Sequence, residues 1–265
     1  MKPAASFGGS PAEHAAARDL AGRRAIVTGA GRGIGRAIAL RLANAGVCVV
    51  VNDVDEARVE AVVETIRQRG QQAAAAPADV ADWDQVQSMT RIAQEAFGGL
   101  EILVNNAGII RRGTIETMRL EDWHQVINVN LTGTFYCCRA AVPLLKASGY
   151  GRIVNVTSIA GKMGDITSAP GYGSSKAGMI ALTKTLAREL ARWGITVNAV
   201  APHAVETEMS GQWSAETRAA VLAGIPLGRL ATEEEVAEAV LYLASPLAGF
   251  ITGETLDING GAWMD

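Results

Sequence analysis

The chain has 265 residues, of which 49% are hydrophobic and 19% are charged, and its formal net charge is −3 at pH 7. This length and apolar content predict one large domain or two small ones with an ample core. No basic stretch is long enough for a nucleic-acid-binding surface, and the longest apolar runs, such as residues 47–51, are too short to span a bilayer.

Residues 1–19 are rich in Ala, Gly, Pro and Ser and lack the apolar stretch of a secretory signal, so we expect a flexible N-terminal tail. Cys48, Cys137 and Cys138 form neither a disulfide framework nor a zinc pattern. The expected compartment is therefore the reducing cytoplasm. The histidines are widely scattered without metal-ligand spacing, so we expect no metal.

From Arg24 onward, short apolar segments alternate with amphipathic helical segments. Strands are predicted at residues 24–29, 47–53, 73–80, 100–108, 152–158, 195–202 and 255–259. Helices are predicted at residues 35–46, 55–70, 81–99, 119–147, 172–193 and 232–244.

Strands that alternate with helices predict a parallel sheet with helices on both faces. The strands are apolar throughout, as expected where both faces are buried. No Pro/Ser-rich linker divides the chain, so residues 20–265 are expected to form one doubly wound α/β domain. In such sheets the ligand lies beyond the carboxyl ends of the strands, which directs attention to the residues after each strand.

The first strand is followed by "TGAGRGIG", residues 28–35. Gly29, Gly33 and Gly35 allow a tight turn and a close approach of the backbone to a pyrophosphate. Their spacing is G-x-x-x-G-x-G rather than the more usual G-x-G-x-x-G. Placed between a first strand and a first helix, the turn favours a dinucleotide site over a plain strand-to-helix turn.

Carboxylates follow the second and third strands. Asp53 lies eighteen residues beyond Gly35, about the separation expected of a group that binds ribose hydroxyls. A helix N-cap is the alternative role, which Asp55 could serve equally well. Asp79 could bind an adenine amino group or cap a helix. After the fourth strand, "NNAG" at 105–108 could hold a cofactor or form a turn.

Ser158 follows the fifth strand, and Tyr172 and Lys176 open the next helix four residues apart, where they share a face. A free tyrosine has a pKa near 10, too high for a good base at neutral pH. A nearby ammonium favours the phenolate. The pair is therefore suited to proton exchange with an alcohol or ketone.

These motifs, in this order, resemble the short-chain dehydrogenase/reductase family of about 250 residues from about Leu20 to the C-terminus. The resemblance implies a Rossmann-type seven-stranded sheet, a nicotinamide cofactor, a homotetramer, and a catalytic tetrad of Asn130, Ser158, Tyr172 and Lys176. It also implies cofactor contacts from Gly29, Arg32, Gly33, Ile34, Gly35, Asp53, Asp79, Val80, Asn106, Ala107, Gly108, Tyr172, Lys176, Pro202, Val205 and Thr207.

Within the tetrad, Tyr172 is expected to exchange the proton and Ser158 to hydrogen-bond the reacting oxygen. Lys176 would also hold the nicotinamide ribose, and Asn130 would bind a water that relays protons to Lys176. From the residues alone, Asn130 reads instead as an amide that kinks its helix.

The sequence departs from the family after the sixth strand, where His203 occupies the position of the usual glycine between Pro202 and Thr207. A glycine would permit a positive φ that histidine adopts less readily. We expect a strained or solvent-facing His203 side chain; a different loop path, or a His203 that faces the substrate, is the alternative. Residues 204–226 are expected to form a substrate lid.

The substrate is less defined. Arg111 and Arg112 follow the N-N-A-G motif. The segment that contains them resembles that of the sugar-acid dehydrogenases of the family, which act on gluconate or deoxygluconate. An arginine at this place could bind a substrate carboxylate through two hydrogen bonds. A solvated arginine pair is the alternative. The second substrate hypothesis is a 3-oxoacyl thioester, as in the 3-oxoacyl reductases of fatty-acid synthesis. A hypothesis of another class is a dinucleotide-sensing binding protein without activity, which the complete tetrad argues against.

Asp53 favours NAD over NADP, because its carboxylate would repel a 2′-phosphate. Arg32 favours NADP, because an arginine near the ribose could pair with that phosphate. We give Asp53 the greater weight and expect NAD. Segments 126–145 and 177–190 are more apolar than one buried face requires, so we expect a homo-oligomer, a tetramer or a dimer. A small-molecule substrate is the only other partner expected, without nucleic acid or membrane.

Overall fold

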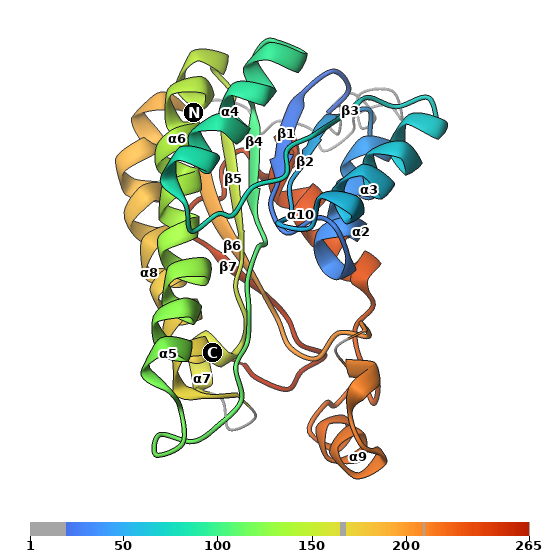
Figure 1. The fold of residues 1–265 in the computed structure, drawn as a ribbon, viewed down its shortest axis with the longest axis vertical. Coiled ribbons are helices and arrows are strands. Elements are labelled where there is room, and N and C mark those ends of the chain that lie inside the picture. Colours follow the sequence, from blue (N-terminus) through green and yellow to red (C-terminus); the bar gives the residue numbers. More distant parts are fainter. Residues whose placement is uncertain (1–19, 165–167, 209, 265) are drawn as a thin grey trace, which may run out of the picture.

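The computed structural model of the protein describes residues 20–164, 168–208 and 210–264; the predicted tail, residues 1–19, lies outside them. Within the described residues, seven parallel strands form one sheet in the order β3-β2-β1-β4-β5-β6-β7 (Figure 1). The strands are β1 Arg24–Val27, β2 Cys48–Val51, β3 Ala73–Ala75, β4 Ile102–Asn105, β5 Arg152–Val156, β6 Thr196–Pro202 and β7 Thr255–Ile258. The predicted doubly wound α/β fold is confirmed.

Helices cover both faces of the sheet: α2, α3 and α10 lie on one face and α4, α6 and α8 on the other (Figure 1). Ala25 and Val27 of β1 join the first core, and Ile26 between them joins the second. The helices are α2 Gly33–Asn44, α3 Glu56–Gln68, α4 Trp83–Phe97, α5 Leu120–Ile127, α6 Gly133–Ser148, α7 Ala160–Met163, α8 Pro170–Leu190, α9 Ala215–Ala223 and α10 Glu233–Ala244.

Several helices begin where a side chain caps them. The Asp55 carboxylate accepts from the Arg58 N–H before α3, and Asp82 accepts from the Asp84 and Gln85 N–H groups before α4. These caps satisfy backbone donors that have no partner within the helix. The predicted third strand is shorter than expected because Pro77, which lacks an N–H, follows it closely.

The predicted helical region 119–147 is not one continuous helix. A π-helical turn, Asn128–Thr132, separates α5 from α6. The backbone carbonyl of Asn130 in this turn accepts from the Thr134 hydroxyl at 2.7 Å. Such turns occur at functional sites more often than elsewhere, and this one places the buried Asn130 side chain beside α8.

The lid region contains a helix that the sequence analysis did not predict. Helix α9 extends away from the rest of the molecule (Figure 1) and buries none of its residues. Its apolar contacts come from Val221 and Leu222 near its end, which are too few to give the periodicity by which a helix is recognised. Its first turn is capped by Ser214, which accepts from the Thr217 N–H at 3.1 Å.

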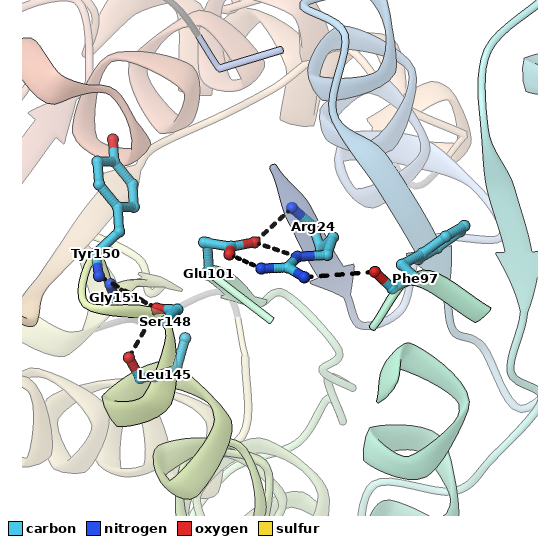
Figure 2. A network of polar contacts seen from close by, with 7 residues as sticks. All are labelled: Arg24, Phe97, Glu101, Leu145, Ser148, Tyr150 and Gly151. Atoms are coloured by element: carbon cyan, nitrogen blue, oxygen red, sulfur yellow. Dashed lines mark hydrogen bonds and ion pairs between the residues drawn. The ribbon is translucent and has the colours of Figure 1, made fainter. Parts of the chain in front are cut away.

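The amino edge of the sheet is fastened by a polar network (Figure 2). Glu101 accepts hydrogen bonds from the Arg24 backbone N–H and Nε, both at 2.8 Å, and pairs with the same guanidinium. On the neighbouring connection, the Ser148 hydroxyl accepts from the Tyr150 N–H at 3.2 Å. The Glu101 contacts tie the start of β1 to the start of β4 at the edge opposite the glycine-rich turn, whereas the Ser148 contact stays within the connection from α6 to β5. In the described part of the chain, no helix is long and apolar enough to cross a membrane.

Candidate active site

A glycine-rich turn, residues 28–35, joins β1 to α2 at the carboxyl edge, next to the point where the strand order reverses between β1 and β4. Gly29 has a φ of 60°, and a Cβ on it would lie 2.7 Å from the Cα of Ala107. A Cβ on Gly35 would collide with the Gly29 carbonyl oxygen. The bare backbone that results, at the N-terminus of α2, fits the pyrophosphate of a dinucleotide.

The N-N-A-G segment after β4 braces this turn. Asn106 Nδ2 donates to the carbonyl oxygens of Thr28 and Gly29, both at 3.0 Å. The Thr28 hydroxyl oxygen accepts from the backbone N–H groups of Asn106 at 3.0 Å and Ala107 at 3.1 Å. Thr28 had no predicted role of its own, because Asn106 and Ala107, its hydrogen-bond partners, lie far away in the chain.

Asp53 lies beside the glycine-rich turn. Its Oδ2 accepts from the Gly31 N–H at 3.1 Å and its Oδ1 from the Asp55 N–H at 3.2 Å. Asp55, not Asp53, caps α3. The Asp53 carboxylate is therefore placed where the sequence predicts a ribose-binding group, and the alternative role as the cap falls to Asp55.

The other predicted cofactor residues near this turn have contacts with other parts of the protein. Asp79 is exposed, and its Oδ1 accepts from the Ala81 N–H at 2.9 Å, as in a capping turn. Val80 is buried against Gly133, where a Cβ would lie 2.8 Å from Val80 Cγ2. Arg32 is exposed and pairs with Glu208 at 3.4 Å, which joins the glycine-rich turn to the start of the lid. Gly33 and Ile34 begin α2.

Tyr172 and Lys176 lie on the same side of α8, as predicted from their spacing. The Lys176 Nζ is 5.7 Å from the centroid of the Tyr172 ring and donates to the Val156 carbonyl oxygen at 2.8 Å. The lysine is 4% exposed, and burial lowers the pKa of Lys176 to about 8. The ammonium is thus held beside the phenol at the end of β5.

Asn130 reaches the same place from the π-helical turn. Its Oδ1 accepts from the Ile109 N–H at 2.8 Å, and its Nδ2 donates to the Ile109 carbonyl oxygen and to the Ser175 hydroxyl, both at 3.0 Å. A Cβ on Gly108 would lie 3.3 Å from Asn130 Oδ1 and 3.5 Å from Lys176 Nζ. The amide oxygen and the ammonium therefore border one small space that glycine leaves open.

Ser158 lies between the end of β5 and α7. Its hydroxyl oxygen accepts from the Ala160 N–H at 3.2 Å. That contact uses a lone pair of the oxygen and not the hydroxyl proton, which a ligand oxygen could accept. Pro202 closes β6 beside this segment, and its carbonyl oxygen accepts from the Ile159 N–H at 3.1 Å. Sequence reasoning missed Ser175, although its place between Tyr172 and Lys176 indicated the same helix face.

The match to known proteins covers most of the chain. Residues 29–262 match the family model described as enoyl-(acyl carrier protein) reductase. The chain is 44% identical over 243 residues to 3-oxoacyl-(acyl-carrier-protein) reductase FabG of Staphylococcus aureus. The aligned residues cover 91% of this chain and 98% of that relative. The protein belongs to the short-chain dehydrogenase/reductase family. It is an oxidoreductase that depends on a nicotinamide dinucleotide, and the predicted resemblance is confirmed.

Solved structures of the short-chain dehydrogenase/reductase family match equally well. The 3-oxoacyl-(acyl-carrier-protein) reductase of Brucella melitensis has a TM-score of 0.90 at 33% identity, with 99% of both chains covered. A protein of Sinorhizobium meliloti assigned as a short-chain alcohol dehydrogenase has a TM-score of 0.88 at 37% identity, with 93% of this chain and 98% of that chain covered. The relatives named as 3-oxoacyl reductases match the second substrate hypothesis rather than the sugar-acid hypothesis.

His203, which stands where the family usually has a glycine, does not have a positive φ. Among the described residues only glycines have a positive φ. His203 continues from β6 with its N–H donating to the Ile258 carbonyl oxygen at 3.0 Å. Val205 then forms a parallel bridge with Ala231, and the Thr207 N–H donates to the Ser210 hydroxyl at 2.9 Å. The segment predicted to form the lid therefore starts without a positive φ at His203, so histidine fits there without backbone strain.

The two arginines after the N-N-A-G motif differ in their surroundings. Arg111 Nε pairs with Asp122 Oδ1 at 3.3 Å, and its Nη2 donates to Gln125 Oε1 at 2.6 Å. Arg112 is exposed. Because α5 already engages the Arg111 guanidinium, a substrate carboxylate bound there would compete with Asp122 and Gln125 for its donors. The described residues contain no group of three or more His, Cys, Asp or Glu side chains that could hold a metal ion.

Proposed function

We propose that the enzyme reduces the ketone of a 3-oxoacyl thioester to the corresponding secondary alcohol. The observation that carries this proposal is the 44% identity to a relative named for that reaction, over nearly the whole of both chains. The pairing of Arg111 with Asp122 supports the same choice, because it weakens the main argument for a sugar-acid substrate.

The proposed proton transfer is carried by side chains at the carboxyl edge. Tyr172 gives its phenolic proton to the oxygen of the reduced ketone, and Lys176 beside it stabilises the phenolate that remains. Ser158 donates a hydrogen bond from its hydroxyl to the same oxygen and keeps its proton. A bound nicotinamide supplies the hydride. The Asn130 oxygen and the Lys176 ammonium, which border the space at Gly108, are the groups proposed to hold the water and the ribose.

The proposed cofactor is NAD(H) rather than NADP(H), and the charges around the glycine-rich turn support this choice. Asp53 sits against Gly31, and Arg32, the residue that could pair with a 2′-phosphate, is already paired with Glu208. Glu233 lies close to the same turn, since a Cβ on Gly33 would be 3.8 Å from its Oε1. A 2′-phosphate bound beside Gly31 would therefore meet the Asp53 carboxylate directly, and the nearby Arg58 is itself paired with Asp55.

A substrate panel tests the proposal. Purified enzyme is assayed with acetoacetyl-CoA in the reductive direction and with gluconate, 2-deoxygluconate and simple polyols in the oxidative direction, each with both cofactors. We expect the highest kcat/KM with acetoacetyl-CoA. Turnover of a sugar acid with a kcat/KM more than tenfold above that of the thioester would contradict the proposed substrate and restore the sugar-acid hypothesis.

Arg111→Gln provides a matched variant for that panel. If the thioester is the substrate, the change should leave its kcat/KM within about threefold, because the guanidinium is engaged by Asp122 and Gln125. A selective loss of sugar-acid activity in this variant would instead assign Arg111 to substrate recognition.

A further inference from the structure

Ser175 is a buried hydroxyl that neither the sequence motifs nor the proposed proton transfer assigns a role. It is 0% exposed and lies on the inner side of α8 between Tyr172 and Lys176. Its Oγ donates to the Tyr172 carbonyl oxygen at 2.7 Å and accepts from Asn130 Nδ2 at 3.0 Å. It thus forms a direct side-chain link between the π-helical turn and the helix that carries the phenol and the ammonium.

The direction of these hydrogen bonds is fixed by the chemistry of the groups. A serine hydroxyl has one proton, and here the proton goes to the Tyr172 carbonyl oxygen, so the hydroxyl can only accept from Asn130. Asn130 therefore turns its NH₂ toward α8 and the Ile109 carbonyl oxygen, and its oxygen toward the Ile109 N–H. Both hydrogens of the amide are used.

The position of the Asn130 oxygen matters because it borders the same space as the Lys176 ammonium, at Gly108. Asn130 is not on a regular α-helix but on a π-helical turn, a rare form that appears mostly as a single turn within α-helices and frequently at functional sites. The bonds to Ile109 tie the amide to the loop after β4. Among the hydrogen bonds of the described residues, the one to Ser175 ties the amide to α8.

We propose that Ser175 is a positioning residue, whose hydroxyl fixes the Asn130 amide to α8 and so keeps Asn130 in register with Tyr172 and Lys176. Ser175 acts through Asn130 and does not touch the substrate. The inference rests on the proposed roles of the tetrad, but not on which ketone the enzyme reduces.

Thr183 offers a matched control two turns further along α8. It is also 0% exposed, its Oγ1 donates to the Met179 carbonyl oxygen at 2.8 Å, and it accepts from Asn155 Nδ2 at 2.8 Å. The hydroxyl, the carbonyl acceptor and the asparagine donor are the same as at Ser175. The difference is that Asn155 belongs to β5 and bonds to Asn105, away from the phenol and the ammonium.

The experiment compares Ser175→Ala with Thr183→Val, using NADH or NADPH and a ketone that the wild-type enzyme reduces. Ser175→Ala should lower kcat about tenfold while the KM for the ketone and the Kd for the cofactor stay within about twofold. Thr183→Val should lower the unfolding midpoint and leave kcat within about twofold. Equal losses of kcat in the two variants would show a general structural effect and overturn the proposal.

A double-mutant cycle with Asn130→Ala completes the test. If Ser175 acts through Asn130, adding Ser175→Ala to Asn130→Ala should cause no further loss of kcat. Losses that multiply would overturn the proposal. Should Ser175→Ala fail to fold, Ser175→Cys makes the same comparison, because a thiol fills the space but is a weak hydrogen-bonding group. If the wild-type enzyme reduced another ketone but not acetoacetyl-CoA, the result would contradict the proposed substrate and not the proposed role of Ser175.

Discussion

At the scale of single residues, the proposed proton transfer depends on the hydroxyl of Tyr172. Tyr172→Phe keeps the ring and removes the group that exchanges the proton. We expect kcat to fall by at least ~10²–10⁴, the usual contribution of general acid–base catalysis. Cofactor affinity, measured by fluorescence titration, should change little. A variant with near-normal turnover would contradict the assigned role of the phenol.

The burial of the Lys176 ammonium is expected to lower the free energy of unfolding. Its folded pKa is lowered to about 8 from the ordinary 10.5, so an ammonium is held in a place that disfavours charge. Lys176→Met should abolish activity yet raise the free energy of unfolding at pH 7 by about 1–3 kcal/mol, measured by urea denaturation.

The pH dependence of that difference has a defined sign. Between pH 8 and 10.5 the folded wild type has released the Lys176 proton, whereas the unfolded chain still holds it. The wild type therefore gains stability relative to Lys176→Met as the pH rises through this window. A stability difference that stays constant from pH 7 to 10 would contradict the burial of a charged lysine.

Residue-scale prediction from sequence succeeded where the partners are close in the chain. The neighbourhood of Tyr172 and Lys176 follows from helix geometry alone. The bond from Asn130 to Ser175 spans 45 positions and that from Asn106 to Thr28 spans 78, and neither leaves a local pattern. The ion pair of Arg111 with Asp122 was missed because a loop conformation decides which carboxylate a nearby arginine meets.

At the scale of elements, the glycine-rich turn and the end of β2 together set the proposed cofactor preference. Asp53→Ser removes the carboxylate beside Gly31. We expect the ratio of kcat/KM for NAD(H) to that for NADP(H) to fall by tenfold or more, about 1.4 kcal/mol, because affinity for NAD(H) weakens and repulsion of a 2′-phosphate is relieved.

Asp55→Ser is the matched control for Asp53→Ser. It removes a carboxylate two positions away, while serine can still cap α3, so the cofactor ratio should stay near that of the wild type. A wild type that already prefers NADP(H), or a ratio that does not move in Asp53→Ser, would reject the assignment. Arg32 would then be the deciding residue, and Glu208→Gln should strengthen NADP(H) binding by releasing it.

The elements themselves were predictable to different degrees. All seven strands of the observed sheet and the long helices follow from apolar runs, helical periodicity and glycine stops, as at β1 and α2. The π-helical turn at Asn128–Thr132 was not predicted, since one extra residue in a helical turn hardly disturbs the pattern of apolar positions. Helix α9 has no fully buried residue, and its two partly buried apolar side chains, Val221 and Leu222, are too few to give a periodic signal.

At the scale of the whole molecule, apolar side chains remain on the surface. Phe135 of α6 is 41% exposed, and Leu247 and Phe250 after α10 are 45% and 104% exposed. Together with the apolar character of segments 126–145 and 177–190, these side chains are expected to be covered by another subunit. Size-exclusion chromatography with light scattering at micromolar concentration should give a multiple of the 27.7 kDa chain mass. A monomeric mass would contradict the predicted homo-oligomer, and Phe135→Glu should shift the distribution toward smaller species.

The central claim is that this site transfers a hydride to the ketone of a 3-oxoacyl thioester while Tyr172 supplies the proton. The most direct measurement incubates the enzyme with acetoacetyl-CoA and NADH that carries deuterium at both C4 positions of the nicotinamide, and analyses the product by mass spectrometry. We predict 3-hydroxybutyryl-CoA with one deuterium on C3, formed by the wild type and nearly absent with Tyr172→Phe. An unlabelled product, no product from the wild type, or an equal yield from Tyr172→Phe would contradict the account.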